Sequence, residues 1–365
     1  MRILHVVGRM DRAGLETFIM NIYRNIDRKK IQFDFIVHTE EKAAYDDEIE
    51  QLGGKIYHVV RYNPPNLKYF EQINSIMSAN TYEIVHSHID CMSSLPLAIA
   101  KYNKIPIRIA HSHSSSESFD IKYPIKFLSK LLIPVFATNL FACGVRAGKW
   151  MFGRRKFSVI KNGIDTEKFK FDNDVRNNVR EKLGIEQGQV AIGHVGRFET
   201  VKNHEFILKI FSSYHLINKN SVLILVGKGE LENKIESFAS DLGIKDCVKF
   251  LGVRDDIPQL MNAMDLFLMP SFFEGLPLVL VESQSTGLPC LISNVIPHDC
   301  DIVPTLVTRE SLENSADIWA NNIDIMLNKY RRTNCSNVVK SKGFDSLMNA
   351  NMMENMYFDL VREVR

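Results

Sequence analysis

The sequence lacks the features that mark several classes of protein. Its 365 residues include only six cysteines, and none of them forms a C-x-x-C pair. Several lie within apolar runs, so we interpret them as small buried side chains in a reducing compartment rather than as a disulfide framework. No apolar run is long enough for a membrane-spanning helix, and the first apolar stretch is too short for a signal peptide. The sequence therefore predicts a cytoplasmic protein that is not integral to a membrane.

Neither sign of charge is in excess. Lys and Arg number 45 against 43 Asp and Glu, which gives a net charge of +2. A dedicated nucleic-acid-binding protein would show a basic excess, so we expect no nucleic-acid partner. The hydrophobic fraction of 45% and the charged fraction of 24% are ordinary for a globular enzyme. The length suits two domains better than one.

Short apolar runs alternate along the chain with longer stretches of helical periodicity. This alternation predicts an α/β protein with parallel sheets and helices on both faces of each sheet. The pattern restarts at residue 190, after a turn signal and a polar stretch, so we place a linker at 163–186. Two doubly wound, Rossmann-like domains are expected, 1–165 and 166–344, followed by a helix over 345–365. The predicted strands are 3–7, 33–37, 55–59, 84–88, 107–111, 139–143, 158–160, 190–195, 221–226, 248–251, 266–269, 290–293 and 305–307.

The segment 265–287 combines a strand, a loop and a helix. Residues 266–269 are apolar and read as a buried strand, while 271–276 are polar and contain a glycine. Pro277 suits the first helical position, where its missing N–H would have no partner anyway. Gly287 suits the end of the helix.

Two carboxylates flank the start of this predicted helix. Glu274 lies in the loop and Glu282 on the helix, with seven residues between them. A helix N-terminus attracts an anion through its free N–H groups and its dipole. Carboxylates accept hydrogen bonds from hydroxyls. A diphosphate with a sugar at each end fits this pattern, so the segment predicts a nucleotide-sugar site.

Cations follow an earlier strand of the same predicted domain. Arg197 and Lys202 come after the strand 190–195, next to Gly196, whose small size allows a ligand close to the backbone. A departing nucleoside diphosphate gains negative charge, which fixed cations stabilise. The alternative is two solvated bases at a helix entry.

The pair of glutamates resembles the E-x7-E motif of retaining glycosyltransferases of family 4, which have the GT-B fold. Residues 193–203, 225–231 and 248–254 resemble further motifs of that family and occur in the family's order. The departure from the common pattern at 294–299 fits its exopolysaccharide and capsule subgroup. The resemblance implies two domains facing across a cleft, with the last helix crossing back to the first domain. The residues that it assigns to donor binding are Gly14, Gly196, Gly227, Val253, Arg254, Gly275, Leu276, Pro277, Leu278 and Glu282.

Two His-x-His pairs stand at predicted strand ends, at 86–88 and 111–113. Alternate residues of a strand face the same way, so either pair is a candidate metal site and a zinc hydrolase is a rival interpretation. We find no third ligand at a recognisable spacing, and His86 and His88 also suit a structural role. The resemblance implies that His111 or His113 contacts the donor sugar, and we favour His113.

The stretch 121–162 has no acidic residue and nine Lys or Arg interleaved with apolar side chains. One interpretation is an amphipathic helix packed on the sheet with a solvated basic face. The other is a patch, with Lys122, Lys126 and Lys130, that rests on the anionic inner face of the plasma membrane.

The predicted function is transfer of a hexosyl or N-acetylhexosaminyl group, with retention, from a nucleotide-sugar to a glycan or polyprenyl-diphosphate-linked acceptor. The catalytic candidates are Glu274, Arg197, Lys202, His111 and His113. The sequence does not identify the base, and we expect a UDP-linked donor. The resembled fold implies that no metal is needed, and no cofactor is expected. Three alternatives stay open: a nucleotide-sugar epimerase of the same fold, a metal-dependent hydrolase that uses the His-x-His pairs, and a binding protein without turnover.

Overall fold

The computed structural model describes residues 1–63, 67–114 and 123–364, which form two compact units. The first unit is Met1–Gly163 with Ser346–Arg365, and the second is Ile164–Asp345. The boundaries expected from the sequence differ from these by one or two residues. Each unit contains one parallel sheet with flanking helices, so the predicted α/β class is confirmed.

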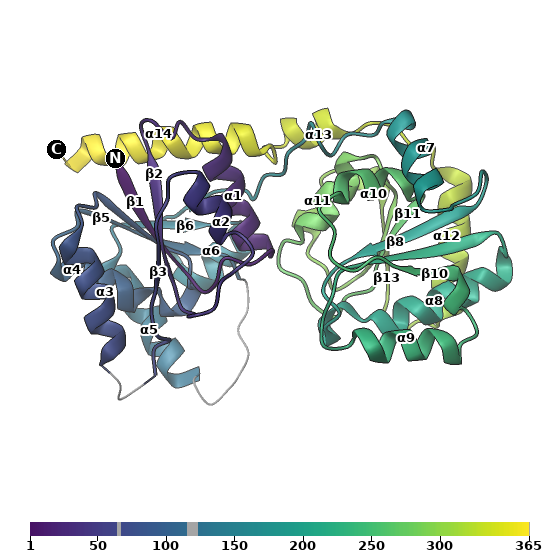
Figure 1. Ribbon diagram of the computed structural model, residues 1–365, viewed down its shortest axis with the longest axis horizontal. Coiled ribbons are helices and arrows are strands. Elements are labelled where there is room, and N and C mark those ends of the chain that lie inside the picture. The colour runs from purple at the N-terminus through teal and green to yellow at the C-terminus, as the bar shows by residue number, and fades with distance from the viewer. Residues whose placement is uncertain (64–66, 115–122, 365) are drawn as a thin grey trace. The chain divides into compact units, whose positions relative to one another are not determined.

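The sheet of the first unit has seven strands (Figure 1). They are β1 (Arg2–Val7), β2 (Gln32–Val37), β3 (Ile56–His58), β4 (Ile84–Ser87), β5 (Ile107–Ser112), β6 (Asn139–Ala142) and β7 (Ser158–Val159). Their order across the sheet is β3-β2-β1-β4-β5-β6-β7, and the pairings are parallel. The helices are α1 (Gly14–Asn25), α2 (Asp46–Gln51), α3 (Lys68–Ala79), α4 (Ser94–Tyr102), α5 (Tyr123–Phe136), α6 (Val145–Phe152) and α14 (Ser346–Val364).

Apolar residues cover both faces of this sheet, because successive side chains of a strand point to opposite faces. Ile3 and Val7 of β1 belong to a core cluster under α1 and α14. Leu4 and Val6 belong to a second cluster on the other face. The first of these faces also carries the histidines described below.

The last helix, α14, packs along α1 in the first unit (Figure 1). Its buried residues include Ala350, Met353 and Tyr357. Leu347 and Met352 also lie at helical spacing in this stretch, but they are 50% and 38% exposed. The helical spacing located the helix correctly, but its start had too few apolar residues to fix the rotation.

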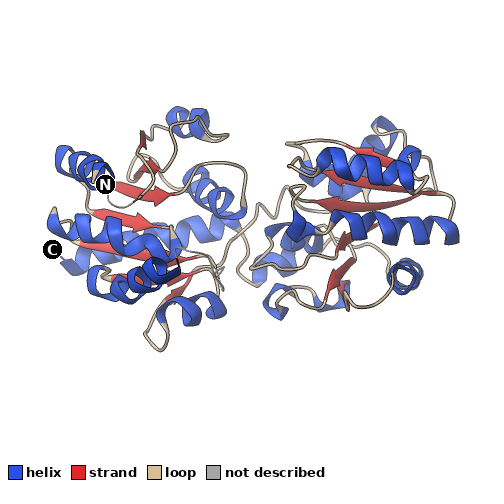
Figure 2. Cartoon of the chain, turned by 90° about the horizontal axis from the view of Figure 1, so that it is seen from below, coloured by secondary structure: helices blue, strands red, loops and turns tan. Residues whose placement is uncertain are grey.

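The sheet of the second unit has six parallel strands with helices on both sides (Figure 2). They are β8 (Val190–Val195), β9 (Ser221–Val226), β10 (Val248–Phe250), β11 (Leu266–Met269), β12 (Cys290–Ser293) and β13 (Val307–Glu310). Their order is β10-β9-β8-β11-β12-β13. The helices are α7 (Asn173–Lys182), α8 (His204–Ile217), α9 (Glu232–Asp241), α10 (Ile257–Ala263), α11 (Leu278–Ser285), α12 (Ala316–Lys329) and α13 (Ser336–Ser341).

The last strand is displaced from its prediction. Residues 305–307 were expected in a strand, but Pro304–Leu306 form a short 3-10 turn and β13 begins at Val307. Proline at the start of this turn has no N–H to give to a sheet, so the ladder begins after it.

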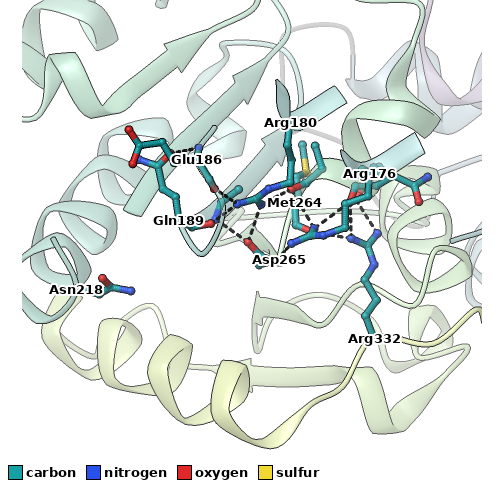
Figure 3. Close-up of polar contacts among 12 residues, drawn as sticks. Arg176, Arg180, Glu186, Gln189, Asn218, Met264, Asp265 and Arg332 are labelled. Atoms are coloured by element: carbon teal, nitrogen blue, oxygen red, sulfur yellow. Dashed lines mark hydrogen bonds and ion pairs between the residues drawn. The ribbon is translucent and has the colours of Figure 1, made fainter. Parts of the chain in front are cut away.

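The predicted linker at 163–186 is wrong for much of its length, because it contains α7. Asp172 caps this helix, and its side chain accepts hydrogen bonds from the backbone N–H groups of Asp174 and Val175. Arg176 and Arg180 on α7 then bind the two oxygens of Asp265, at 2.5 and 3.1 Å (Figure 3). The helix is therefore fixed to the second unit by these guanidinium groups as well as by Val175 and Val179, which pack in the core.

The cysteine prediction is confirmed for burial. All six cysteines are free; five are buried and Cys247 is partly exposed. Among the described residues, no helix is both long and apolar enough to cross a membrane.

Candidate functional site

The turns that follow β8, β9 and β10 are bonded to one another at the carboxyl edge of the second sheet. The Gly196 N–H donates to the Val226 carbonyl at 2.9 Å, and the Gly227 N–H donates to the Gly252 carbonyl at 2.8 Å. Gly227 has φ +136°, and a Cβ there would lie 2.1 Å from the Gly196 carbonyl oxygen. Only glycine fits at Gly227, so the backbones of two predicted donor-binding residues, Gly196 and Gly227, are held in close contact.

Lys202 and Glu274 form an ion pair at the same edge. Lys202 Nζ lies 2.6 Å from Glu274 Oε1, and the two side chains are 19% and 10% exposed. The Phe272 N–H donates to the Val201 carbonyl at 2.9 Å, which ties the loop after β11 to the loop after β8. Two residues that are 72 positions apart in the sequence, and were predicted to act on one ligand, are thus in contact.

Arg197 and Arg254 lie on the rim of this edge and pair within their own loops. Arg197 is 63% exposed and lies 3.0 Å from Glu199, while Arg254 lies 2.7 Å from Asp256. Val253 is 58% exposed. These three predicted residues are therefore accessible from solvent, and Arg197 is the more exposed of the two predicted phosphate-binding cations.

The N-terminus of α11 follows the Glu274 loop. Pro277 precedes the first helical residue, Leu278, and no side chain caps the helix. The prediction that Pro277 occupies the first helical position is off by one residue, because its backbone is extended, with ψ 107°. Gly275 and Leu276 are half-buried in the loop. The first N–H groups of α11 are thus available to an anion.

Glu282 lies on α11, as predicted, and is partly buried. Burial raises the pKa of its carboxyl group to about 7, from an ordinary value of 4.5. The prediction that Gly287 ends this helix region is confirmed by its φ of +66°.

A cavity of about 1050 Å³ lies near the opposite, amino edge of the same sheet, beside Val190 and Asp265. Arg176, Arg180 and Arg332 line it, but their guanidinium groups already bind Asp265 and backbone carbonyls (Figure 3). We therefore read this cluster as structural.

In the first unit, His113 follows β5 and is partly exposed, whereas His111 within β5 is 1% exposed. The backbone N–H of His113 donates to one carboxylate oxygen of Asp90 at 2.9 Å, and the Ser114 hydroxyl donates to the other at 2.8 Å. Asp90, with φ 44°, was not identified from the sequence. It fixes the backbone that carries His113.

The two His-x-His pairs meet on one face of the first sheet, together with His5 of β1. Two groups of three have ring nitrogens within 4.8 Å of one another and can hold a metal ion: His5, His86 and His88, and His88, His111 and His113. The sequence analysis found no third ligand, and the structure corrects this. Burial lowers the pKa of all five imidazoles, so the rings are neutral near pH 7. Their nitrogens are largely committed to one another.

Gly14, the remaining predicted residue, is the first residue of α1. No side chain caps that helix, and no atom lies within 4 Å of the position that a Cβ at Gly14 would take. The start of α1 is therefore open to a ligand.

The chain matches a profile described as "Glycosyl transferases group 1" over residues 175–341. It is 36% identical over 368 residues to "Putative glycosyltransferase EpsF" of Bacillus subtilis (strain 168), an alignment that covers 98% of this chain and 96% of the relative. The chain belongs to the group 1 glycosyl transferases.

Further similarities lie within polysaccharide assembly and the GT-B fold. The chain is 29% identical, over 81% of its length and 80% of the relative, to the "UDP-Gal:alpha-D-GlcNAc-diphosphoundecaprenol alpha-1,3-galactosyltransferase" of Escherichia coli. Anabaena HepE, solved in complex with UDP, superposes with a TM-score of 0.81 at 19% identity, covering 98% of this chain and 100% of HepE. The predicted GT-B fold and family are confirmed. These similarities give no support to the epimerase or hydrolase alternatives.

Two histidines of this glycosyltransferase escaped the sequence analysis. The His194 Nδ1–H donates to the Leu268 carbonyl at 2.8 Å, and its Nε2 has no partner among the described residues. That nitrogen lies 2.9 Å from where a Cβ of Gly196 would be. His204 stacks on Phe198 close by. The only available signal was the position of His194 on β8, which gave no reason to separate it from a core residue.

Proposed function

We propose that this glycosyltransferase moves a hexosyl or N-acetylhexosaminyl group from a UDP-linked sugar to a glycan or polyprenyl-diphosphate-linked glycan. The anomeric configuration is retained and no metal takes part. The observation that carries this proposal is the contact between Lys202 and Glu274, beside the uncapped start of α11. The cation and the free N–H groups suit a diphosphate, and the neighbouring carboxylate suits the sugar that is joined to it.

The diphosphate is assigned to three sources of positive charge. Lys202 is partly buried, so solvent screens its charge little. Arg197 would approach the diphosphate from the rim of the site. The N–H groups at the start of α11 add hydrogen bonds. These groups stabilise the negative charge that grows on the leaving UDP, which is the task that a divalent cation performs in metal-dependent transferases.

Glu274 is assigned to the hydroxyls of the transferred sugar, and Glu282 to the ribose. In the absence of substrate, Glu274 accepts from Lys202. A diphosphate competes for the Lys202 ammonium group and leaves Glu274 oxygens available to sugar hydroxyls. His111 or His113 of the first domain is assigned to the sugar as well.

In the proposed step, the acceptor hydroxyl oxygen attacks the anomeric carbon on the face from which UDP departs. The bond between that carbon and the phosphate oxygen breaks, and both of its electrons stay with UDP. The proton of the acceptor hydroxyl passes to the departing phosphate oxygen. No protein nucleophile is needed, and the configuration is retained.

Two relatives support the choice of substrates. HepE was solved with UDP and with UDP-glucose. The Escherichia coli relative is named for transfer from UDP-galactose to a sugar on diphosphoundecaprenol. A lipid-linked acceptor places the enzyme at the cytoplasmic face of the membrane, which we include in the proposal.

The test is a transfer assay with a panel of UDP-sugars and a synthetic GlcNAc-diphosphate-lipid acceptor, run in EDTA, with the product anomer read by NMR. The proposal predicts a product of retained configuration with one UDP-sugar. Product only after addition of a divalent cation would contradict metal independence. Release of an epimerised sugar without acceptor would contradict transfer. Full activity of Arg197→Ala would remove that residue from the diphosphate site.

The outward face of α5 supports contact with a membrane. Six apolar side chains on it are 37–59% exposed: Ile125, Phe127, Leu128, Leu131, Leu132 and Val135. The sheet side of the helix instead carries Ser129 and Ile133. The interpretation of this stretch as an amphipathic helix packed on the sheet with a solvated basic face holds for the packing of Ile133 but does not account for these six exposed apolar side chains. Apolar residues flanked by bases suit an anionic lipid surface.

The three predicted lysines differ in their surroundings. Lys130 Nζ lies 3.9 Å from the centre of the Trp150 ring, Lys126 is partly buried, and Lys122 lies outside the described residues. We expect the apolar face to contribute more to binding than these lysines. Co-sedimentation with phosphatidylglycerol vesicles should fall with Leu128→Ser/Leu131→Ser, fall less with Lys126→Glu/Lys130→Glu, and stay unchanged with Lys219→Glu in the second domain. Unchanged sedimentation of the serine variant would contradict the membrane contact.

A further inference from the structure

Five histidines, four of them buried and His113 partly buried, form two separate hydrogen-bonded rows on one face of the first sheet. His5 of β1 pairs in register with His86 of β4, and alternate residues of a strand share a face. One row joins Tyr357, His86 and His111. The other joins His5, His88 and His113. Both rows lie beneath α1 and α14.

The first row begins at Tyr357 on α14. Its hydroxyl lies 2.8 Å from His86 Nδ1, and His86 Nε2 lies 3.2 Å from His111 Nδ1. Tyr357 is 1% exposed, and its hydroxyl has no other hydrogen-bond partner among the described residues. A buried O–H that donates to nothing carries a penalty of about 1–3 kcal/mol. In the reverse direction the hydroxyl proton would have no acceptor and His111 Nε2 would be an unpartnered acceptor among the described residues, whereas donation to His86 leaves only one unpartnered group. The hydroxyl therefore donates to His86.

This donor direction sets the proton positions of both histidines. A neutral imidazole has a single N–H, and burial keeps these rings neutral. Because His86 Nδ1 accepts, its proton lies on Nε2 and is donated to His111 Nδ1. The proton of His111 must then lie on Nε2. That nitrogen is buried and has no partner among the described residues.

We propose that Tyr357 is a positioning residue that acts through His86 to hold His111 in the Nε2–H tautomer, so that His111 offers a hydrogen-bond donor to a substrate oxygen. The substrate part of this inference rests on the proposed function, in which His111 or His113 is assigned to the transferred sugar. The tautomer part rests on the contacts alone. The final helix thereby gains a role in preparing the site, besides its packing on α1.

The second row provides an internal comparison. His5 Nδ1 and His88 Nε2 are 3.0 Å apart, as are His88 Nδ1 and His113 Nε2. The two end nitrogens, His5 Nε2 and His113 Nδ1, have no partner among the described residues. Among the residues that the structure describes, no hydroxyl lies within hydrogen-bond distance of either end nitrogen, so no such group favours one proton direction over the other. His113 should therefore populate both tautomers.

The first measurement reads the tautomers directly. Protein with 15N-labelled histidine, without substrate, gives long-range 15N–1H correlations in which a protonated ring nitrogen differs from an unprotonated one. The expected result is Nε2–H for His86 and His111 and a mixture for His113. A mixture or Nδ1–H at His111 would overturn the proposal, and this result needs no variant. Zn²⁺ bound at one equivalent, with EDTA-reversible shifts of these nitrogens, would also overturn it in favour of a metal site.

The second measurement uses Tyr357→Phe, which keeps the ring and removes only the hydroxyl. His111 should change to a mixture of tautomers, whereas His113 should be unaffected. With half of the molecules competent, the donor KM rises or kcat falls by about twofold, and more if the wrong tautomer is favoured. In a His111→Ala background, Tyr357→Phe should have no further effect on transfer. A tautomer change without a kinetic change would overturn the positioning role.

The two proposals fail in different ways. The tautomer is observed without substrate, so a protein that transfers no sugar yet shows the expected spectra contradicts the proposed function and leaves the proton positions standing. Normal transfer by wild type together with an unchanged His111 spectrum in Tyr357→Phe contradicts only the role of Tyr357.

Discussion

Lys202 Nζ lies 2.6 Å from Glu274 Oε1, and both side chains are largely buried. Each is therefore the main counter-charge of the other until an anionic ligand arrives. The loops that carry them follow β8 and β11, neighbouring strands of the sheet. In the proposed function, Lys202 neutralises Glu274 in the free enzyme and a donor phosphate in the complex, so donor binding would release Glu274.

Substitution of either partner should reduce activity strongly. Glu274→Gln and Lys202→Met should each lower kcat/KM by on the order of 100-fold, because each removes charge stabilisation from the reacting centre. The double variant should lose little more than the worse single variant, since the two residues act as a unit. Steady-state kinetics of the three variants, after thermal melting has confirmed folding, provide the cycle.

The matched control is Glu199→Gln, which removes the acidic partner of the exposed Arg197. Exposed pairs contribute about 0–1 kcal/mol, so both stability and activity should change little. Strictly additive losses at Lys202 and Glu274 would show that they act on separate steps.

Gly227→Ala should disrupt the turns at the carboxyl edge of the second sheet. The new Cβ would lie 2.1 Å from the Gly196 carbonyl oxygen, and the residue would have to keep φ +136°. We expect a loss on the order of 3 kcal/mol in the free energy of unfolding, together with loss of nucleotide binding. Urea unfolding followed by fluorescence measures the first effect.

Gly243→Ala is the matched control, because it introduces backbone strain without a steric clash. Gly243 has φ +68°, but nothing lies within 4 Å of its Cβ position. This variant should lose only about 1 kcal/mol and keep nucleotide binding. Equal losses at the two glycines would contradict close packing as the reason for Gly227.

We expect the free energy of unfolding to depend on pH because of Glu282. Burial raises the pKa of its carboxyl group to about 7 in the folded protein, against an ordinary 4.5 in the unfolded chain. Between these values the folded protein holds a proton that the unfolded chain has lost. The free energy of unfolding therefore falls as pH rises from about 4.5 to about 7 and then levels off.

Glu282→Gln should remove this contribution because glutamine stays neutral. The variant should be more stable than wild type at pH 8, by on the order of 2 kcal/mol, and equally stable at pH 4.5. Denaturant unfolding at the two pH values measures the difference. A stability difference that is the same at both pH values would rule out a perturbed carboxyl group.

The sequence was enough to predict most of the strands and the residues that follow them at the carboxyl edge of the second sheet, and the reason is physical. Parallel strands are buried on both faces, so they appear as short apolar runs, and the residues that follow them meet at one edge. Glu274 and Lys202 were found in this way, whereas Gly227 came from the family resemblance. The helix α7 was missed because its few apolar residues, such as Val175 and Val179, lie in a polar and charged stretch, and Arg176 and Arg180 add polar contacts to Asp265.

Residues whose role depends on contacts between distant segments could not be found. His5 joins the histidine cluster only because β1 lies beside β4, and Tyr357 reaches His86 from 271 positions away. Asp90 supports His113 through a backbone N–H, which no residue pattern records. Similarly, the exposed side of α5 could not be told from its buried side, since Ser129 and Ile133 face inward while leucines face outward.

The most direct test of the central claim is the thermal midpoint of wild type and Lys202→Met across UDP, ADP and GDP titrations, all in EDTA. A ligand that binds the native state stabilises it by about 2.7 kcal/mol at 100 times its Kd. The account predicts that UDP raises the midpoint of wild type, that ADP and GDP do so less, and that Lys202→Met loses most of the UDP effect. An equal UDP shift in both proteins, or a shift that appears only when a divalent cation replaces EDTA, would contradict a metal-independent diphosphate site built on Lys202.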